Sequence, residues 1–281
     1  MTPELPLVVV DRVIATALEE DLASGDLTTE ACIPAGALAV AHAVARRPMV
    51  ACGGPVFGRV FTRVDASLVV ETSVEEGARV DGGARLWTVR GRARAILMAE
   101  RVALNLVQRM CGVATQARTY VDAVPPGCAT RITDTRKTTP GLRALERYAV
   151  RVGGAHNHRD DLGAAVLIKD NHVAACGGVR PAIERARAAA PHTAKIECEV
   201  DTLDQLDEAL AAGADIVLLD NMPTAMVIEA VKRAGGRALT EVSGGITLAR
   251  VAELARAGVD AISVGALTHS VPAADVGIDF E

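Results

Sequence analysis

The sequence has few aromatic residues and few lysines. Six of its 281 residues are Phe, Tyr or Trp, and only four of its 30 basic residues are lysine. Proteins that bind nucleic acid commonly stack bases on aromatic rings and attract phosphates with excess positive charge. This chain lacks the rings and has a formal net charge of −5, so we expect no nucleic-acid partner.

Long apolar runs and paired cysteines are also missing. No stretch reaches the roughly 18 apolar residues of a membrane-spanning helix, and no basic region followed by an apolar stretch opens the chain. The six cysteines form no CxxC pair, which indicates reduced thiols in a core. With 50% hydrophobic and 23% charged residues, the composition is globular. We expect a cytoplasmic protein with no membrane partner.

The first part of the chain predicts helices on either side of a β-rich segment. Apolar residues at helical spacing predict a helix over 8–23, which GDLTT and Pro34 end. Residues 37–92 alternate between apolar and polar and contain glycine turns, so we expect strands there. A long helical stretch follows over 93–124, interrupted at Gly112. The sequence PPG at 125–127 is the candidate linker.

Beyond the linker, short apolar runs alternate with helix-length segments. Each run ends in polar residues, and Pro or Thr stands near the start of most of the helical segments. This order predicts βα units, and therefore a parallel barrel or a doubly wound sheet. The predicted strands lie in 129–137, 165–171, 194–200, 214–221, 238–245 and 260–266, and the predicted helices in 140–151, 179–190, 202–212, 223–234 and 247–257.

Every predicted strand of this part ends in residues that can hold a charged ligand. In a βα barrel the carboxyl ends of all strands meet at one face, where active sites are built. A complete ring of such ends is difficult to explain as solvated loops, so we expect a functional site there. The ends are Arg136 and Lys137, Lys169, Glu199, Asp220, the Ser243-Gly244-Gly245 turn and the Gly265-Ala266 turn.

The charges around this ring indicate the ligand. The first two units and the segment between them supply cations, which suit a ligand with several carboxylates or phosphates. Glu199 and Asp220 suit ribose hydroxyls or a Mg²⁺ ion that keeps its water. Backbone amides of the turns SGG (243–245) and VGA (264–266) can hold a terminal phosphate. Together these groups suggest phosphoribosyl transfer. The cations are Arg136, Lys137, His158, Arg159 and Lys169.

Nine strings of the sequence resemble the quinolinate phosphoribosyltransferase family, also called the carboxylating nicotinate-nucleotide pyrophosphorylases. They occur in the family's order over nearly the whole chain, and DTRKTTPGLR and LIKDNH are highly specific. The strings are EEDLASGDLTT (19–29), ERVALNLVQRMCGVAT (100–115), DTRKTTPGLR (134–143), GGAHNHR (153–159), LIKDNH (167–172), ECEVDTL (197–203), LLDNM (218–222), SGGI (243–246) and SVGALTHS (263–270).

The resemblance implies an α/β fold with two domains. An α/β sandwich-like domain over 1–125 is completed by the C-terminal segment, about 267–281, and an incomplete seven-stranded α/β barrel occupies 126–266. It also implies a homodimer, or a higher oligomer, in which the N-terminal domain of one subunit covers the barrel mouth of its partner. The implied reaction joins quinolinate to 5-phosphoribosyl-1-pyrophosphate, releases pyrophosphate and CO₂, and gives nicotinate mononucleotide for de novo NAD synthesis.

The resemblance also implies residue roles. The substrate-binding stretch Thr135-Arg136-Lys137, together with His158, Arg159 and Lys169, matches positions around the quinolinate carboxylates, with Lys137 close to both substrates. Glu199 and Asp220 match acids that bind ribose and Mg²⁺, directly or through water, and with Lys137 and Lys169 they form the expected catalytic set. Arg101 matches an arginine that reaches a neighbouring subunit's site. The phosphate loops match Ser243, Gly244, Gly245, Val264, Gly265 and Ala266.

One local departure leaves the substrate open. After Arg159 the family continues with an apolar residue, glycine and leucine, whereas this chain has Asp160, Asp161, Leu162, Gly163 and Ala164. The alternatives are a paralogue that uses another pyridine carboxylate in a secondary pathway, and a non-catalytic ligand-binding paralogue. A Schiff-base aldolase that uses Lys137 or Lys169 is disfavoured, because the surrounding cations include no obvious acid/base partner.

Overall fold

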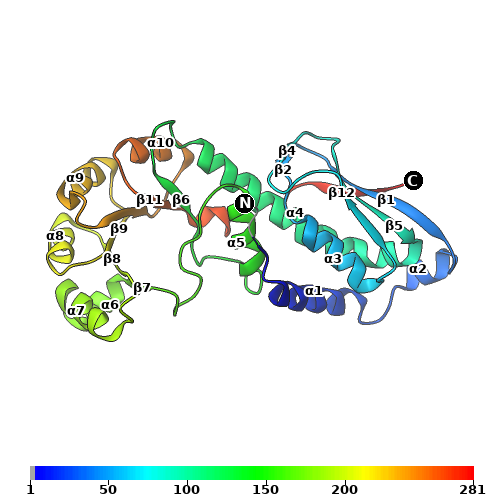
Figure 1. Ribbon diagram of the computed structural model, residues 1–281, viewed down its shortest axis with the longest axis horizontal. Helices are drawn as coiled ribbons and strands as arrows, with labels where there is room; N and C mark the ends of the chain where they lie inside the picture. Colours follow the sequence, from blue (N-terminus) through cyan, green and yellow to red (C-terminus); the bar gives the residue numbers. More distant parts are fainter. Residues whose placement is uncertain (1–3) are drawn as a thin grey trace. The chain divides into compact units, whose positions relative to one another are not determined.

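The computed structural model describes residues 4–281, which form two compact units (Figure 1). The first holds the chain up to residue 118 together with 138–154 and 266–281, and the second holds 119–137 and 155–265. The sequence pattern had placed 138–154 with the barrel. No helix within residues 4–281 is long and apolar enough to cross a membrane.

The first unit contains an antiparallel sheet of four strands in the order β12-β1-β5-β3. Its edge strand β12 comes from the end of the chain and pairs with β1, with Ala41 opposite Phe280. The C-terminal segment therefore completes a sheet that begins more than 200 residues earlier. The strands are β1 (Leu38–Ala45), β3 (Val69–Thr72), β5 (Arg85–Arg92) and β12 (Val276–Phe280), and a separate two-stranded sheet pairs β2 (Met49–Val50) with β4 (Arg79–Val80).

Two helices of the first unit were not expected from the sequence. Helix α3 interrupts the segment predicted to be β-rich; it buries Val56, Phe57, Val60 and Phe61 on one face, and this spacing is helical. Helix α2 forms from the residues predicted only to end α1, because the Asp26 carboxylate accepts the N–H of Thr29 at 2.9 Å as an N-cap. The helices are α1 (Leu7–Leu22), α2 (Leu27–Cys32), α3 (Gly54–Val64), α4 (Ala93–Asp122) and α5 (Arg143–Val152).

The predicted interruption at Gly112 was wrong, because α4 is continuous through it. A Cβ atom at Gly112 would collide with the backbone carbonyl oxygen of Pro272. Glycine is required here by the close approach of the C-terminal segment, and the helix tolerates its conformational cost. The sequence pattern showed the glycine but not the contact that explains it.

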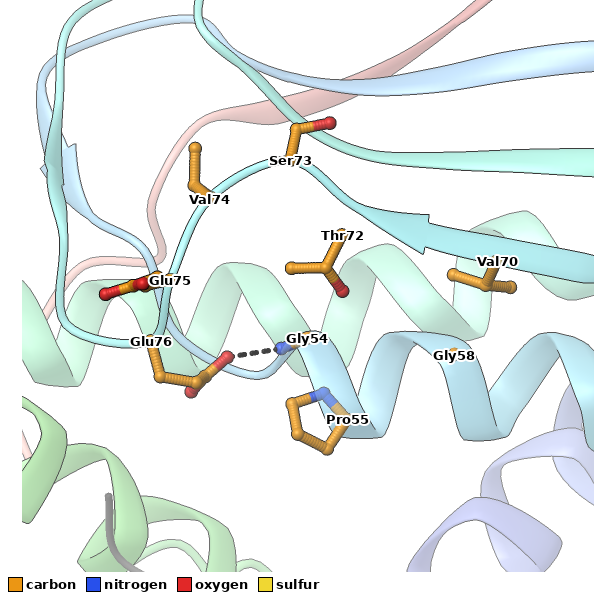
Figure 2. A pocket seen from close by; sticks show the side chains of 9 residues that line it. All are labelled: Gly54, Pro55, Gly58, Val70, Thr72, Ser73, Val74, Glu75 and Glu76. Atoms are coloured by element: carbon orange, nitrogen blue, oxygen red, sulfur yellow. Dashed lines mark hydrogen bonds between the residues drawn. The ribbon is translucent and has the colours of Figure 1, made fainter. Parts of the chain in front are cut away.

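Helix α5 is held in the first unit by two carboxylates, the half-buried Glu76 and the buried Glu146. Glu76 accepts the N–H of Gly54 at the start of α3 at 2.7 Å (Figure 2). It also accepts the N–H of Gly53 at 3.0 Å and the Tyr148 hydroxyl of α5 at 2.9 Å. Glu146 of α5 is fully buried and pairs with Arg109 of α4 at 2.8 Å. These contacts explain why α5 does not pack as a crossover helix of the barrel, although its place in the chain predicted that.

The second unit is a parallel sheet of six strands in the order β6-β11-β10-β9-β8-β7, with helices along its outer side (Figure 1). The resemblance implied seven strands. In the described chain a seventh strand is not formed, and the segment between β6 and β7 contributes only a single parallel bridge, between Thr133 and His156. The strands are β6 (Arg131–Thr133), β7 (Val166–Ile168), β8 (Ile196–Val200), β9 (Ile216–Asp220), β10 (Leu239–Ser243) and β11 (Ala261–Ser263), and the helices are α6 (Asp170–Cys176), α7 (Val179–Ala189), α8 (Leu203–Ala211), α9 (Thr224–Ala234) and α10 (Leu248–Arg256).

Alternation along these strands separates an apolar face from a polar one. Val217 and Leu219 of β9 are fully buried on one face, while Leu218 and Asp220 point to the other. In β8 the same alternation places Glu197 and Glu199 together. This face therefore carries acids at two heights along the strands. Glu197 lies near the amino end of β8, whereas Glu199 and Asp220 lie near the carboxyl ends of β8 and β9.

Candidate active site

The cation cluster after β6 is partly assembled within the second unit. The Thr135 hydroxyl accepts the N–H of Lys137 at 3.1 Å. Burial and the positive charge of Arg136 lower the pKa of Arg159, and the Arg159 guanidinium donates to the carbonyl of Ala165 at 3.1 Å. The charge of Arg136 thus reaches Arg159, 23 positions later in the sequence, and two guanidinium groups are suited to hold carboxylates or phosphates.

Asp134 holds the segment that carries His158 and Arg159. It is fully buried, and its two carboxylate oxygens accept the Asn157 side-chain amide and the His158 backbone N–H, both at 2.7 Å. Sequence reasoning missed this role, although a carboxylate directly after an apolar run was the available signal. The contact ties residues 157 and 158 to the end of β6.

An ion pair joins two predicted site residues at the carboxyl edge of the sheet. Lys169 Nζ, just after β7, lies 2.6 Å from Glu199 Oε2 in β8. The lysine side chain is 47% exposed and the glutamate side chain 10%. The N–H of Lys169 donates to His172 Nδ1 at 2.9 Å, so His172 fixes the backbone from which the lysine projects.

Asn221 links the acid at the end of β9 to the SGG turn. Its side-chain amide donates to Asp220 Oδ2 at 2.6 Å, and its N–H donates to the Ser243 carbonyl at 3.0 Å. Asn221 has φ 53°, and Gly244 packs against it so closely that a Cβ at 244 would collide with the asparagine side chain. Sequence reasoning overlooked Asn221, even though asparagine tolerates this conformation better than most residues.

One backbone amide of the second predicted phosphate loop, 264–266, is already hydrogen-bonded within the sheet. The N–H of Val264 donates to the Thr133 carbonyl at 2.9 Å, so this amide already has a partner. Gly265 follows it at the start of a short 3₁₀ helix, Gly265–Leu267. By contrast, Gly244 and Gly245 both have positive φ, 89° and 56°, which bends the SGG chain sharply after β10.

His158 does not project as an anion-binding side chain would. Its Nδ1 accepts the N–H of Arg159 at 2.7 Å, and its Nε2 faces Glu197 and Glu241 at 3.3 and 3.4 Å. Both ring nitrogens are therefore engaged within the second unit. The sequence analysis missed the two glutamates, although a charged residue inside a buried strand was a signal.

The remaining predicted residues lie elsewhere in the chain or at its surface. Arg101 is exposed on α4, in the first unit, to which Ala266 also belongs. In the loop that departs from the family pattern, Asp161 accepts the N–H of Gly163 at 2.8 Å. The negative charge of Asp161 also acts to raise the pKa of Arg159, against the larger effect of burial. Asp161 thus orders its own loop beside the cation cluster.

Comparison with known proteins places this site in a family. The sequence model described as "Quinolinate phosphoribosyl transferase, C-terminal domain" matches residues 113–279, and the model of the N-terminal domain matches residues 26–111. The chain belongs to the quinolinate phosphoribosyltransferase family.

Two curated family members illustrate the similarity in sequence. The nicotinate-nucleotide pyrophosphorylase [carboxylating] of Mycobacterium leprae is 50% identical over 274 residues, 95% of each chain. The human protein of the same name is 39% identical over 281 residues, 98% of this chain and 92% of that one.

Two solved structures illustrate the similarity in fold. NadC from Streptococcus pyogenes has a TM-score of 0.94 at 38% identity and covers 99% of both chains. The nicotinate-nucleotide pyrophosphorylase from Francisella tularensis has a TM-score of 0.94 at 36% identity, covering 99% of this chain and 98% of that one. The fold expected from the resemblance, an N-terminal sheet domain and a C-terminal parallel sheet with helices, is confirmed.

Gly244→Ala is expected to damage the junction between Asp220 and the SGG turn. The new Cβ collides with Asn221, and the positive φ of Gly244 disfavours any L-residue. We expect the substitution to weaken binding of 5-phosphoribosyl-1-pyrophosphate, measured by calorimetry, while quinolinate binding changes little. Gly236→Ala is the matched control, because Gly236 also has a positive φ but has open space around it. Equal effects of the two variants would contradict the prediction.

Proposed function

We propose that the protein transfers the phosphoribosyl group of 5-phosphoribosyl-1-pyrophosphate to the nitrogen of quinolinate, with release of pyrophosphate and CO₂. The product is nicotinate mononucleotide, a precursor in de novo NAD synthesis. The observation that carries this proposal is the order of charges at the carboxyl edge of the sheet. Arginines and Lys169 lie at the first strands, and Glu199 and Asp220 follow at the next two.

The two groups of charges suit the two substrates. Arg136, Arg159 and Lys169 would hold the two carboxylates of quinolinate, with Lys137 between the substrates. Glu199 and Asp220 would bind the ribose hydroxyls, and the turn at Ser243 to Gly245 would receive the 5-phosphate. Lys169 is already paired with Glu199, so quinolinate binding would exchange one carboxylate partner of the lysine for another.

The acids also fit a Mg²⁺ ion. Glu199 and Asp220 offer hard carboxylate oxygens at the ends of neighbouring strands, and Mg²⁺ is typically held by one or two carboxylates together with water and substrate phosphates. Each carboxylate is oriented by a neighbour: Glu199 by Lys169 and Asp220 by Asn221. When bound, the ion would neutralise charge on the departing pyrophosphate.

The reaction needs stabilisation of charge more than proton transfer. Departure of pyrophosphate leaves oxocarbenium character at the anomeric carbon, which the carboxylates of Glu199 and Asp220 would stabilise. The pyridine nitrogen of quinolinate then forms the new bond. The alkylated ring is cationic and stabilises the carbanion character left when CO₂ departs from the adjacent carbon. No general base is required, in agreement with a site rich in cations.

Assembly and location complete the proposal. We infer a homodimer, or a higher oligomer built from it, in which Arg101 of one subunit contributes to the site of its partner. The inference rests on the family pattern and on the position of Arg101 in the first unit, on an exposed face of α4. The cytoplasm is the proposed location, because the substrates are soluble intermediates of primary metabolism.

Product analysis tests the proposed function directly. Purified protein with quinolinate, 5-phosphoribosyl-1-pyrophosphate and Mg²⁺ is expected to release CO₂ and form nicotinate mononucleotide in equal amounts. Nicotinate should be a poor substrate, because it lacks the second carboxylate that the cations would hold. Preferential use of another pyridine carboxylate would support the paralogue alternative, and failure to use any would support a ligand-binding protein.

A further inference from the structure

A cavity of about 680 Å³ lies in the second unit, away from the proposed catalytic residues. Its lining includes residues at the beginnings of strands: Arg131 of β6, Ile216 of β9 and Leu239 of β10. Asp220 and Ser243 are the last residues of β9 and β10. Most of the strand residues that line the cavity therefore lie toward the amino ends of the strands, while His158 and Arg159, which also line it, connect it to the cation cluster.

Three buried ionisable groups meet in this cavity. His158 Nε2 lies 3.3 Å from Glu197 Oε2 and 3.4 Å from Glu241 Oε1, and the three side chains are 14%, 5% and 8% exposed. Among the described residues, the other oxygen of Glu197 and Oε1 of Glu241 are buried without a hydrogen-bond partner of normal geometry. Buried carboxylates cost free energy unless they receive protons or cations, so this cluster needs an explanation.

A metal ion is one explanation, since the three ligand atoms lie within 4.8 Å of one another. The histidine argues against it. Nδ1 accepts the N–H of Arg159 at 2.7 Å, so a neutral ring must carry its proton on Nε2, and a charged ring carries protons on both nitrogens. In either state Nε2 has no lone pair for a metal. Its N–H instead faces Glu197 Oε2 at 3.3 Å, with Glu241 Oε1 beside it at 3.4 Å.

The two carboxylates also influence the charge of the ring. Burial lowers the pKa of His158, but the contacts with Glu197 and Glu241 outweigh it and raise the pKa to about 10. Charging the ring would place a proton on Nδ1, which already faces the N–H of Arg159. The contact with the Arg159 N–H therefore belongs to the neutral ring with its proton on Nε2, and this is the state in which the ring holds the backbone.

The His158 ring, which the glutamates hold, in turn fixes the main chain at Arg159. The N–H of Arg159 has His158 Nδ1 as its acceptor, and the N–H of His158 has Asp134. The segment is thus fixed twice, by Asp134 from the end of β6 and by the glutamates through the imidazole. Arg159 follows directly, with burial and the charge of Arg136 acting on its guanidinium.

We propose that Glu197 and Glu241 are positioning residues, which hold the His158 imidazole so that the backbone at Arg159 presents its guanidinium to the quinolinate carboxylates. The presentation of the Arg159 guanidinium to quinolinate rests on the proposed function, whereas the holding of the His158 ring by the two glutamates does not. The glutamates act through His158 and touch neither substrate. They need only to accept the Nε2–H, so glutamine, which keeps a carbonyl oxygen at the same place, is a conservative replacement.

Hydrogen exchange tests the holding of the ring without reference to activity. In Glu197→Ala and Glu241→Ala the ring loses an acceptor, and the amide of Arg159 should exchange about tenfold faster or more, measured by mass spectrometry on peptides covering 156–160. Glu197→Gln and Glu241→Gln should restore most of the protection. The control is Asp215→Ala, which removes the carboxylate that accepts the N–H of Ile196 at the same end of the sheet but does not contact His158.

Steady-state kinetics on the same variants tests the consequence for catalysis. The alanine variants should raise the KM for quinolinate about tenfold or more, with a much smaller change in the KM for 5-phosphoribosyl-1-pyrophosphate. A merely structural loss would affect both KM values alike, as Asp215→Ala is expected to do.

The outcomes separate the inference from the proposed function. Unchanged exchange at Arg159 in both alanine variants overturns the inference, as does one equivalent of divalent metal in wild-type protein that disappears with either glutamate. Increased exchange with equal changes in both KM values also overturns it. Increased exchange in a protein that does not consume quinolinate supports the holding of the ring and contradicts only the proposed function.

Discussion

Lys169→Ala is expected to lower kcat/KM for quinolinate by about 30- to 1,000-fold, equivalent to about 2 to 4 kcal/mol. The lysine would lose its contact with a quinolinate carboxylate, and Glu199 would lose the ammonium group 2.6 Å from its Oε2. An unpaired carboxylate would then face a dianionic substrate, so repulsion adds to the lost attraction. Initial rates over a range of concentrations of both substrates give the measurement.

Lys195→Ala is the matched control for this variant. Lys195 is an exposed lysine just before β8, so its loss changes the net charge equally without altering the pair. Glu199→Gln separates the roles further, because it removes the acid but keeps the lysine. This variant should impair the use of 5-phosphoribosyl-1-pyrophosphate more than quinolinate binding. Kinetics of Lys169→Ala that match those of Lys195→Ala would exclude the lysine from the site.

The positions of the strand ends could be predicted from the sequence. Each apolar run of the second half stops where its strand leaves the core, so Lys169, Glu199, Asp220 and Ser243 were identified by their place in the pattern. The structure has them at or near the ends of β7 to β10. Their roles in binding and catalysis stay predictions, because hydrophobic periodicity reports position and not ligand contact.

The buried glutamates inside the strands could not be predicted in the same way. Glu197 and Glu241 lie inside apolar runs, and their importance depends on His158, which comes from a different part of the chain. Alternation places Glu197 on the same face as Glu199, but only the folded chain shows which histidine meets it. Asn221 was missed for a related reason, since its effect depends on the close approach of Gly244.

In the first unit, one segment of the sequence carries signals for both a turn and a helix. The stretch around Gly53, Gly54 and Pro55 has the composition of a turn, yet it begins helix α3 because Phe57 and Phe61 bury one face. Glu76 satisfies the N–H groups at that helix start. The glycine and proline signals were correct for a helix boundary, and the apolar spacing after them decides that a helix follows.

Mixing two inactive variants is expected to restore activity if the active site is shared between subunits. Arg101→Ala should abolish activity without unfolding the second unit, because Arg101 lies in the first unit on an exposed face of α4. Lys169→Ala removes a cation of the second unit. A mixed dimer would hold one site with both wild-type residues and one with neither. Random exchange puts half the dimers in this class, so recovery should approach about a quarter of wild-type activity per subunit.

The control pair is Lys169→Ala mixed with Glu199→Ala. Both residues belong to the same unit and to one ion pair, so every site of a mixed dimer lacks one of them and no activity should return. Subunit exchange is verified independently by native mass spectrometry of differently tagged chains. If exchange is complete and the Arg101 and Lys169 variants still do not complement each other, Arg101 acts in its own subunit or outside the site. The proposal that one subunit completes the site of its partner would then be wrong.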